Sequence, residues 1–368
     1  MLRTADLEYH LPPELIATQA VEPRDAARLM VVSRSGAETL HRTVRDLPDL
    51  LTPGDLLVFN STRVLPARLH GRRVGTGGRV GGLFLSEPAA GEWTCLLKGG
   101  HLRPGVEIEL LDAAERPAVT LVLLHRDDDE PGAWRVRVQG DQRSCSDLLE
   151  QLGQTPLPPY ILGARASQGV RVDDLVDRAR YQTVFAHDAA EVPGQGSVAA
   201  PTAGLHFTPE LLGALTARGI HRAEVVLHVG TGTFKPVETE YVEQHPMHAE
   251  WCSMPAETIA AIRRAANEGR RVIPVGTTSA RTIEAHADAI ASVSAAPAIA
   301  TRLLITPGYQ WRYCTGLMTN FHLPRSTLLA MLASMFPEGI HRAKALYADA
   351  IERRYRFYSY GDAMLVLP

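Results

Sequence analysis

A change in hydrophobic periodicity between residues 69 and 139 constrains the fold of this chain most strongly. The stretch contains six short apolar segments separated by closely spaced Gly, Pro or Asp turns: LHGRRV, VGGLFL, EWTCLL, VEIELL, AVTLVLL and WRVRVQ. Short, β-rich segments at this spacing are typical of an antiparallel sheet that closes on itself. The sequence therefore predicts a small antiparallel β-barrel over residues 69–143.

The rest of the chain alternates between strand-like and helix-like segments. The apolar segment 55–59 follows a Pro-Gly turn and predicts a buried strand that ends at a polar turn. Strands are also predicted at 222–228 and 271–275, and helices at 146–152, 209–218, 255–269, 280–290 and 328–336. Such alternation indicates an α/β layer. We expect a barrel-like α/β catalytic domain of mixed strands and helices over residues 1–68 and 144–368, into which the β-barrel is inserted.

Composition narrows the class of protein further. A hydrophobic content of 45% with 21% charged residues is ordinary for a soluble globular enzyme. Neither a secretory signal segment nor an apolar run of about 18 residues is present, which predicts a cytoplasmic protein without a membrane span. The four cysteines are far apart and are expected to be buried free thiols. With a net charge of −3, nucleic-acid binding would have to come from a local basic patch.

The basic residues are strongly biased toward arginine. Of the 38 lysines and arginines only three are lysines, and two of them, Lys98 and Lys235, lie in Gly-containing strings. A lysine kept against this bias suggests a site that needs a compact ammonium group. Arginines cluster where the main domain is expected to meet the barrel, at Arg63, Arg68, Arg72, Arg73 and Arg79. This cluster is either such a local basic patch or simply a solvated surface.

Four strings are not explained by packing alone, and the first is GSVAAPTAGLHFT at residues 196–208. Its small residues allow the backbone to approach a ligand closely. His206 lies two residues after Gly204 and just before a predicted helix start, where Thr208 is the expected N-cap. Taken alone, it would be a structural histidine. In this setting it is also a candidate general base or substrate donor.

The second string is HVGTGTFKPV at residues 228–237, a strand end that runs into a Gly-rich turn. Such turns present backbone N–H groups to anions. The string does not match G-x-G-x-x-G, which argues against a dinucleotide site. Nearby, His245, His248 and Glu250 could form a metal triad, but their spacing matches no common zinc motif and Pro246 interrupts a helix. Hydrogen bonding to a substrate is the favoured interpretation.

The third and fourth strings each lead into a predicted helix. VGTTSARTIE, at residues 275–284, brings hydroxyls and Arg281 to a strand-to-helix junction, where a helix N-terminus favours a carboxylate or phosphate. Capping by Thr278 or Ser279 is the simpler explanation. In TNFHLPRSTLL, at residues 319–329, Ser326 or Thr327 can cap the next helix. Capping does not explain Asn320 and His322.

Together, the four strings resemble the S-adenosylmethionine:tRNA ribosyltransferase-isomerase family of queuosine biosynthesis. Other segments carry the same resemblance, so that it extends over essentially the whole chain. They are YHLP at 9–12, EPRDA at 22–26, NSTRVLPAR at 60–68, LKGG at 97–100, PLPPY at 156–160, YQTVF at 181–185 and YRFYSYGD at 355–362.

The resemblance implies an unusual use of S-adenosylmethionine as a ribosyl donor. The ribosyl group would be transferred and isomerised onto 7-aminomethyl-7-deazaguanine at the wobble position of tRNA, giving epoxyqueuosine and releasing adenine and methionine. The sulfonium acidifies the C5′ proton, so the reaction needs a neutral base of pKa near 7, which histidine provides best. The implied partners are the tRNA anticodon loop and S-adenosylmethionine as cosubstrate, with no metal and a monomeric enzyme.

The resemblance also implies which residues form the site. Arg281 would bind the cosubstrate carboxylate, and Lys98 or Lys235 would hold RNA phosphate or lower the pKa of the attacking amine. The candidate catalytic residues are His206, His322, His228 and Lys235. The candidate substrate-binding residues are Asn60, Thr62, Arg63, Lys98, Tyr181, Gln182, Thr183, Ser197, Pro201, Thr202, Gly204, Phe207, Gly230, Gly232, Thr233, His248, Glu250, Gly276, Thr277, Thr278, Arg281, Asn320 and Phe321.

Several positions depart from the family pattern. His10, Ser61 and Thr315 replace residues that are more common in the family, and residues 188–195 resemble an insertion. These departures leave open the alternative that the protein is a paralogue, which performs the same sulfonium chemistry on a free deazapurine. A metal-dependent hydrolase built on His245, His248 and Glu250 is the third alternative.

Overall fold

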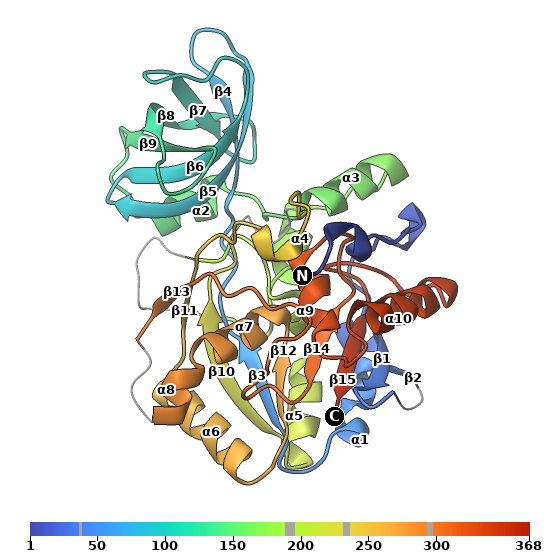
Figure 1. Ribbon diagram of the computed structural model, residues 1–368. Coiled ribbons are helices and arrows are strands. Elements are labelled where there is room, and N and C mark those ends of the chain that lie inside the picture. Colours follow the sequence, from blue (N-terminus) through green and yellow to red (C-terminus); the bar gives the residue numbers. More distant parts are fainter. Residues whose placement is uncertain (37–38, 188–195, 231–235, 293–296) are drawn as a thin grey trace.

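The computed structural model describes residues 1–36, 39–187, 196–230, 236–292 and 297–368. It combines a nine-stranded mixed sheet, covered by helices, with a closed six-stranded barrel that stands above the sheet (Figure 1). The predicted fold class, an α/β body carrying an inserted antiparallel barrel, is therefore confirmed.

The main sheet has the strand order β13-β11-β10-β3-β12-β14-β15-β1-β2. Its strands are β1 (Arg28–Ser33), β2 (Leu40–Thr43), β3 (Leu56–Asn60), β10 (His221–Leu227), β11 (Glu250–Ser253), β12 (Val272–Val275), β13 (Ile299–Thr301), β14 (Leu317–Asn320) and β15 (Ala363–Leu367). The neighbours β10, β3, β12 and β14 are parallel, so their carboxyl ends meet at one edge. Over the described ranges, β13 and β2 are outer strands with one neighbour each. The main sheet, which was expected to be barrel-like, is therefore open over these residues and does not close into a barrel.

Helices cover both faces of the main sheet. In β3, Val58 points into one hydrophobic core and Phe59 into the other. This explains the unbroken apolar run, because a strand buried on both faces needs no polar alternation. The first core includes α6 (Ala256–Asn267), α7 (Thr277–Ala285), α8 (Ala287–Ser292), α9 (Thr327–Ala333) and α10 (Ile340–Glu352). The second includes α1 (Leu47–Leu50) and α5 (Pro209–Ala217).

Two helix starts follow the capping expected from the sequence, and one does not. Thr208 caps α5 and Ser326 caps α9, and each hydroxyl accepts an N–H at 3.1 Å. By contrast, α7 begins at Thr277, and neither Thr278 nor Ser279 caps it. The predicted cap is wrong because Gly276 adopts φ +95°, a conformation open to glycine, and turns the chain directly from β12 into the helix. The predicted helix 280–290 is correspondingly divided between α7 and α8.

The barrel has the order β4-β5-β6-β9-β8-β7 and encloses its own core. Its strands are β4 (Arg68–Arg73), β5 (Arg79–Ala89), β6 (Glu92–Lys98), β7 (Glu107–Leu111), β8 (Pro117–Arg126) and β9 (Ala133–Gln139). Phe84 and Trp93 make an edge contact at the centre of this core, with ring centroids 5.2 Å apart. Helix α2 (Cys145–Leu152) packs Leu148 and Leu149 into the same core.

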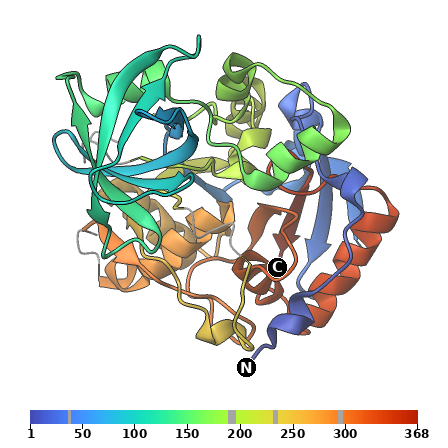
Figure 2. The ribbon, with the colours of Figure 1, turned by 90° about the horizontal axis from the view of Figure 1, so that it is seen from above.

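The barrel is attached at the edge where the parallel strands end. Residues 61–67 lead from the end of β3 into β4, and the barrel stands over the half of the body that contains β10, β11 and α8 (Figures 1 and 2). Helices α3 (Pro159–Gln168) and α4 (Asp174–Arg180) follow α2, joined by a buried Arg165–Asp177 pair with N···O distances of 2.6 and 2.8 Å. The insertion therefore rises beside the place where an α/β sheet binds ligands.

The cysteines behave as predicted, since all four are free and buried. Among the helices that the structure describes, none is long and apolar enough to cross a membrane.

Candidate active site

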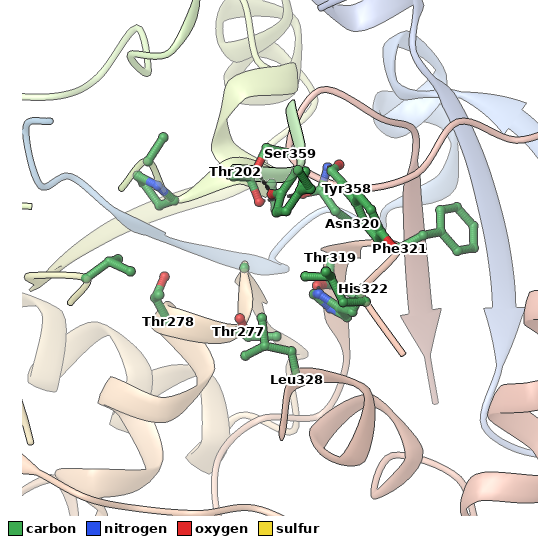
Figure 3. Close-up of a pocket in the computed structure, with 17 residues that line it drawn as sticks. Thr202, Thr277, Thr278, Thr319, Asn320, Phe321, His322, Leu328, Tyr358 and Ser359 are labelled. Atoms are coloured by element: carbon green, nitrogen blue, oxygen red, sulfur yellow. Dashed lines mark hydrogen bonds between the residues drawn. The ribbon is translucent and has the colours of Figure 1, made fainter. Parts of the chain in front are cut away.

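A cavity of about 40 Å³ lies where the parallel strands of the main sheet end (Figure 3). Its walls come from the starts of α7 and α9, the end of β14, the 3-10 segment Thr202–His206 and the turn before β15. Open α/β sheets bind ligands at this edge. The expected site residues that line the cavity are Pro201, Thr202, Gly276, Thr277, Thr278, Asn320, Phe321 and His322.

Sequence reasoning missed part of the cavity wall. Tyr160, Thr319, Tyr358 and Ser359 also line it, and the Tyr160 hydroxyl lies 2.5 Å from Ser359 Oγ. Tyr358 has φ +74°, which is rare for a bulky residue. The segments PLPPY and YRFYSYGD were among those carrying the family resemblance, so the signal for these residues was present but was not assigned to the site.

Asn320 organises one wall through three hydrogen bonds. Its Oδ1 accepts from Thr202 Oγ1 at 3.0 Å, and its Nδ2 donates to the Tyr358 carbonyl at 3.1 Å. Because a carbonyl can only accept, the second bond determines which end of the amide is nitrogen. Nδ2 also lies 3.3 Å from His206 Nε2. His206 Nε2 therefore accepts, which places the proton of the neutral ring on Nδ1 and occupies its only ring lone pair.

His322 is held differently and faces the cavity. Its Nε2 lies 2.8 Å from Thr319 Oγ1, and its backbone N–H donates to the Tyr347 hydroxyl at 2.8 Å. Its carbonyl accepts from the Tyr9 hydroxyl. Across the described part of the chain, His322 Nδ1 has no hydrogen-bond partner. This nitrogen is the ring atom that remains available to a ligand.

Burial controls the charge of both histidines. Desolvation lowers the pKa of His206 to about 3, with further lowering by Arg356 and Arg24. Desolvation also lowers the pKa of His322 to about 3. Both rings are therefore neutral at pH 7, but the pKa near 7 expected for a base is not found, because burial disfavours the protonated form.

His228 and its neighbours stabilise the end of β10. The His228 ring stacks on Trp251 with centroids 5.0 Å apart, and its Nδ1 lies 3.0 Å from Thr62 Oγ1. Burial lowers the pKa of His228 to about 4. Asn60 donates to the Leu227 carbonyl at 2.9 Å and accepts from the Leu227 N–H at 3.1 Å. In this structure Asn60, Thr62 and His228 hold the backbone beside the cavity.

Arg281, which was expected to bind the cosubstrate carboxylate, does not line the first cavity. It lies 6% exposed in the second turn of α7 and forms an ion pair with Glu250, which also accepts from the Gly230 N–H at 2.9 Å. Desolvation lowers the pKa of Arg281 to about 10. These two residues and His248 line a small adjacent pocket, which shares Leu328 with the first cavity. No group of three or more His, Cys, Asp or Glu side chains suited to a metal occurs among the residues placed by the structure.

A separate cavity of about 440 Å³ contains four further expected residues, namely Arg63, Tyr181, Gln182 and Thr183. The Gln182 side chain bonds both backbone groups of Val64, at 3.1 and 3.2 Å. Arg63 pairs with Glu150 at 2.9 Å, and Tyr181 packs against Tyr360. Gln182 thereby joins the loop after β3 to the segment after α4, whereas Arg63 joins that loop to α2.

The remaining expected residues lie apart from the cavity. Ser197 donates to the Ala199 carbonyl and accepts from the Val229 N–H, while Gly204 lies against Phe185. Phe207 is buried in the second core, and Lys98 is exposed at the end of β6 in the barrel. Three expectations, Gly232, Thr233 and Lys235, lie outside the described residues.

Comparisons with known proteins agree with this geometry. A family model described as "Queuosine biosynthesis protein" matches residues 4–366. Two relatives are both named S-adenosylmethionine:tRNA ribosyltransferase-isomerase. The relative from Gloeobacter violaceus is 46% identical over 99% of this chain and 96% of its own length, and the relative from Thermotoga maritima is 41% identical over 100% of both chains.

A solved structure is similar over nearly the whole chain. It is described as the crystal structure of S-adenosylmethionine tRNA ribosyltransferase from Thermotoga maritima, with 33% identity and a TM-score of 0.51. The match covers 98% of this chain and 100% of the solved one. On the evidence of the family model and these relatives, the chain belongs to the queuosine biosynthesis protein family.

Proposed function

We propose that this protein is an S-adenosylmethionine:tRNA ribosyltransferase-isomerase. It transfers and isomerises the ribosyl group of S-adenosylmethionine onto 7-aminomethyl-7-deazaguanine at the wobble position of tRNA, forming epoxyqueuosine and releasing adenine and methionine. The observation that carries the proposal is that all four strings, distant in sequence, contribute residues to the lining of one cavity at the carboxyl edge of the sheet. The names of the full-length relatives support the same activity.

In this proposal His322 removes the C5′ proton and His206 is a positioning residue. His322 lines the cavity, and in the proposed tautomer its Nε2–H donates to Thr319 Oγ1, which leaves the Nδ1 lone pair free to accept. The lone pair of His206, by contrast, is occupied by Asn320. A pKa of about 3 makes His322 a weak base before the cosubstrate binds. A carboxylate bound near the ring would favour the imidazolium and raise that pKa toward the range a general base needs.

The remaining assignments follow from the same proposal. Residues 69–143 form the inserted domain, and residues 1–68 and 144–368 form the catalytic domain. Arg68, at the start of β4 near the junction, and Arg72 and Arg79, at the opposite end of β4 beside the hairpin turn into β5, contact the tRNA. The wobble base of the tRNA must leave its stack to be modified. The enzyme works as a cytoplasmic monomer and uses no metal.

Mass spectrometry of nucleosides tests the proposal directly. Unmodified precursor tRNA would be incubated with the protein and S-adenosylmethionine carrying ¹³C in the ribosyl carbons. Labelled epoxyqueuosine in the tRNA digest, together with free adenine and methionine, is the expected result. Adenine release with the free deazapurine base but not with tRNA would instead favour the paralogue. Methyl transfer without ribosyl transfer would contradict both.

A further inference from the structure

The N-terminus of α7 is buried without a cap. The N–H groups of Thr277, Thr278 and Ser279 have no acceptor within the described ranges, although these residues are only 8%, 9% and 0% exposed. The preceding residue, Gly276, has no side chain that could accept from them. A helix start that is buried without partners for its N–H groups indicates a missing acceptor.

Thr278 supplies a second, independent observation. Its Oγ1 is buried, has no hydrogen-bond partner among the residues the structure places, and belongs to a side chain that lines the cavity. Figure 3 shows Thr277 and Thr278 on the opposite side of the cavity from Thr202 and Ser359. A buried hydroxyl without a partner costs free energy, so this group also indicates a ligand acceptor at the same place.

The shape of the backbone leaves room for that acceptor. A Cβ at position 276 would lie 3.6 Å from Thr278 Oγ1 and 3.8 Å from Ala203 Cβ, so that any side chain there would fill the space above the helix start. The positive φ of Gly276 also favours glycine. The N–H groups, the hydroxyl and the helix dipole all favour a negatively charged ligand.

We infer that this helix start is the binding site for the carboxylate of the amino-acid part of S-adenosylmethionine. The inference rests on the proposed function and deepens it. It also replaces the expected role of Arg281, whose charge is already compensated by Glu250. The carboxylate is therefore bound by neutral donors, Thr278 Oγ1 and the first N–H groups of α7, in the cavity that His322 also lines. Its negative charge would raise the pKa of His322 on binding.

The test compares two ligands on several variants by titration calorimetry of the full-length protein. The ligands are S-adenosylmethionine and its decarboxylated analogue, which lacks only the carboxylate. Thr278→Val keeps the shape and removes the donor. Because hydrogen bonds to charged groups contribute about 1.5–3 kcal/mol, Thr278→Val should weaken S-adenosylmethionine binding roughly 10- to 100-fold and leave the analogue unchanged. Thr278→Ser should retain most of the affinity.

A matched control lies one turn further along the same helix. Thr282 is also buried, but its hydroxyl already donates to the Thr278 carbonyl at 2.9 Å. Thr282→Val should therefore leave the affinity ratio of the two ligands unchanged. If Thr278→Val does not fold, as judged by thermal melting, Thr278→Ala serves as the second variant.

Three outcomes would overturn the inference, and they separate it from the proposed function. Equal affinity of the parent protein for both ligands would refute the carboxylate site alone. An equal loss for both ligands in Thr278→Val would show that the hydroxyl acts elsewhere in the site. If the parent protein bound neither ligand, the proposed function itself would fail, and the inference with it.

Discussion

The barrel and the edge of the main sheet are both built from β-structure, but they bury different chemistry. The barrel core is largely apolar, and its buried Asp127 is fully partnered by Thr94 and Arg135. Other barrel charges are paired across strands at the surface, as in Arg72–Glu109 at 2.9 Å and Arg137–Glu92 at 3.0 Å. The sheet edge instead buries hydroxyls, an amide and imidazoles, including Thr278, Asn320 and His322. Burying polar groups disfavours folding unless they find partners. The difference indicates that the buried polar groups at the sheet edge serve to bind a ligand. The residues of the barrel mainly stabilise the barrel itself and form its charged surface.

The largest expected effect comes from removing the free imidazole at the sheet edge. His322→Ala should lower turnover by about 10²- to 10⁴-fold, the usual contribution of a general acid or base, while binding of S-adenosylmethionine persists. Hydrogen exchange from C5′ into deuterated water should stop in this variant. His206→Ala should retain the exchange, because its lone pair is already occupied by Asn320.

A second measurement tests the roles of the two histidines without requiring turnover. Nitrogen NMR of labelled histidine should report the Nδ1–H tautomer for His206 in the parent protein. An Nε2–H tautomer, or loss of C5′ exchange only in His206→Ala, would reverse the assignment of the two rings. If both variants exchanged at the parent rate, neither ring would be the base, and His228 and His248 would become the next candidates.

Acid should loosen the sheet edge before the barrel. His206 and His322 have folded-state pKa values of about 3, below the ordinary value of 6.5, so the unfolded chain binds protons more readily between these limits. Their contribution to the free energy of unfolding is complete above pH 6.5 and falls by up to about 1.4 kcal/mol per histidine for each pH unit below it. Amide exchange should rise first in β14 and α9, and His322→Asn should flatten the pH dependence. Earlier exchange in the barrel would contradict the comparison.

The surface of the barrel should matter for RNA but not for the cosubstrate. The double variant Arg72→Gln with Arg79→Gln should weaken tRNA binding and reduce the slope of log affinity against log salt by about 1 for each lost phosphate contact. Affinity for S-adenosylmethionine should not change. Arg264→Gln, at an exposed position on α6, is the matched control. Unchanged tRNA binding in the double variant would identify these arginines as solvated surface.

Chelation should have the smallest effect. In the proposed reaction the sulfonium itself supplies the electrophilic activation that a metal would otherwise provide, so turnover should survive exhaustive treatment with EDTA. If EDTA abolished turnover and zinc restored it, the result would support a metal site formed by His245, His248 and Glu250.

Local pattern predicted much of the architecture from the sequence alone. The six barrel segments coincide with β4 to β9, and the caps of α5 and α9 were correctly identified, because strand periodicity and capping depend on residues that are close in sequence. The strings that line the cavity were also visible, since small residues, hydroxyls and histidines at strand ends are not explained by packing. The early start of α7 was missed, because it depends on the backbone conformation of Gly276.

Only the tertiary structure decided which of these residues contact one another and how each contact changes their chemistry. The contact between His206 and Asn320, 114 positions apart, determines which ring nitrogen can accept a proton. The Arg281–Glu250 pair likewise compensates a cation that appeared free in the sequence. Both are long-range contacts formed where strands of the main sheet bring their ends to one edge. Hydrogen-bond partners and desolvation at that edge are set by distance in space rather than by spacing along the chain.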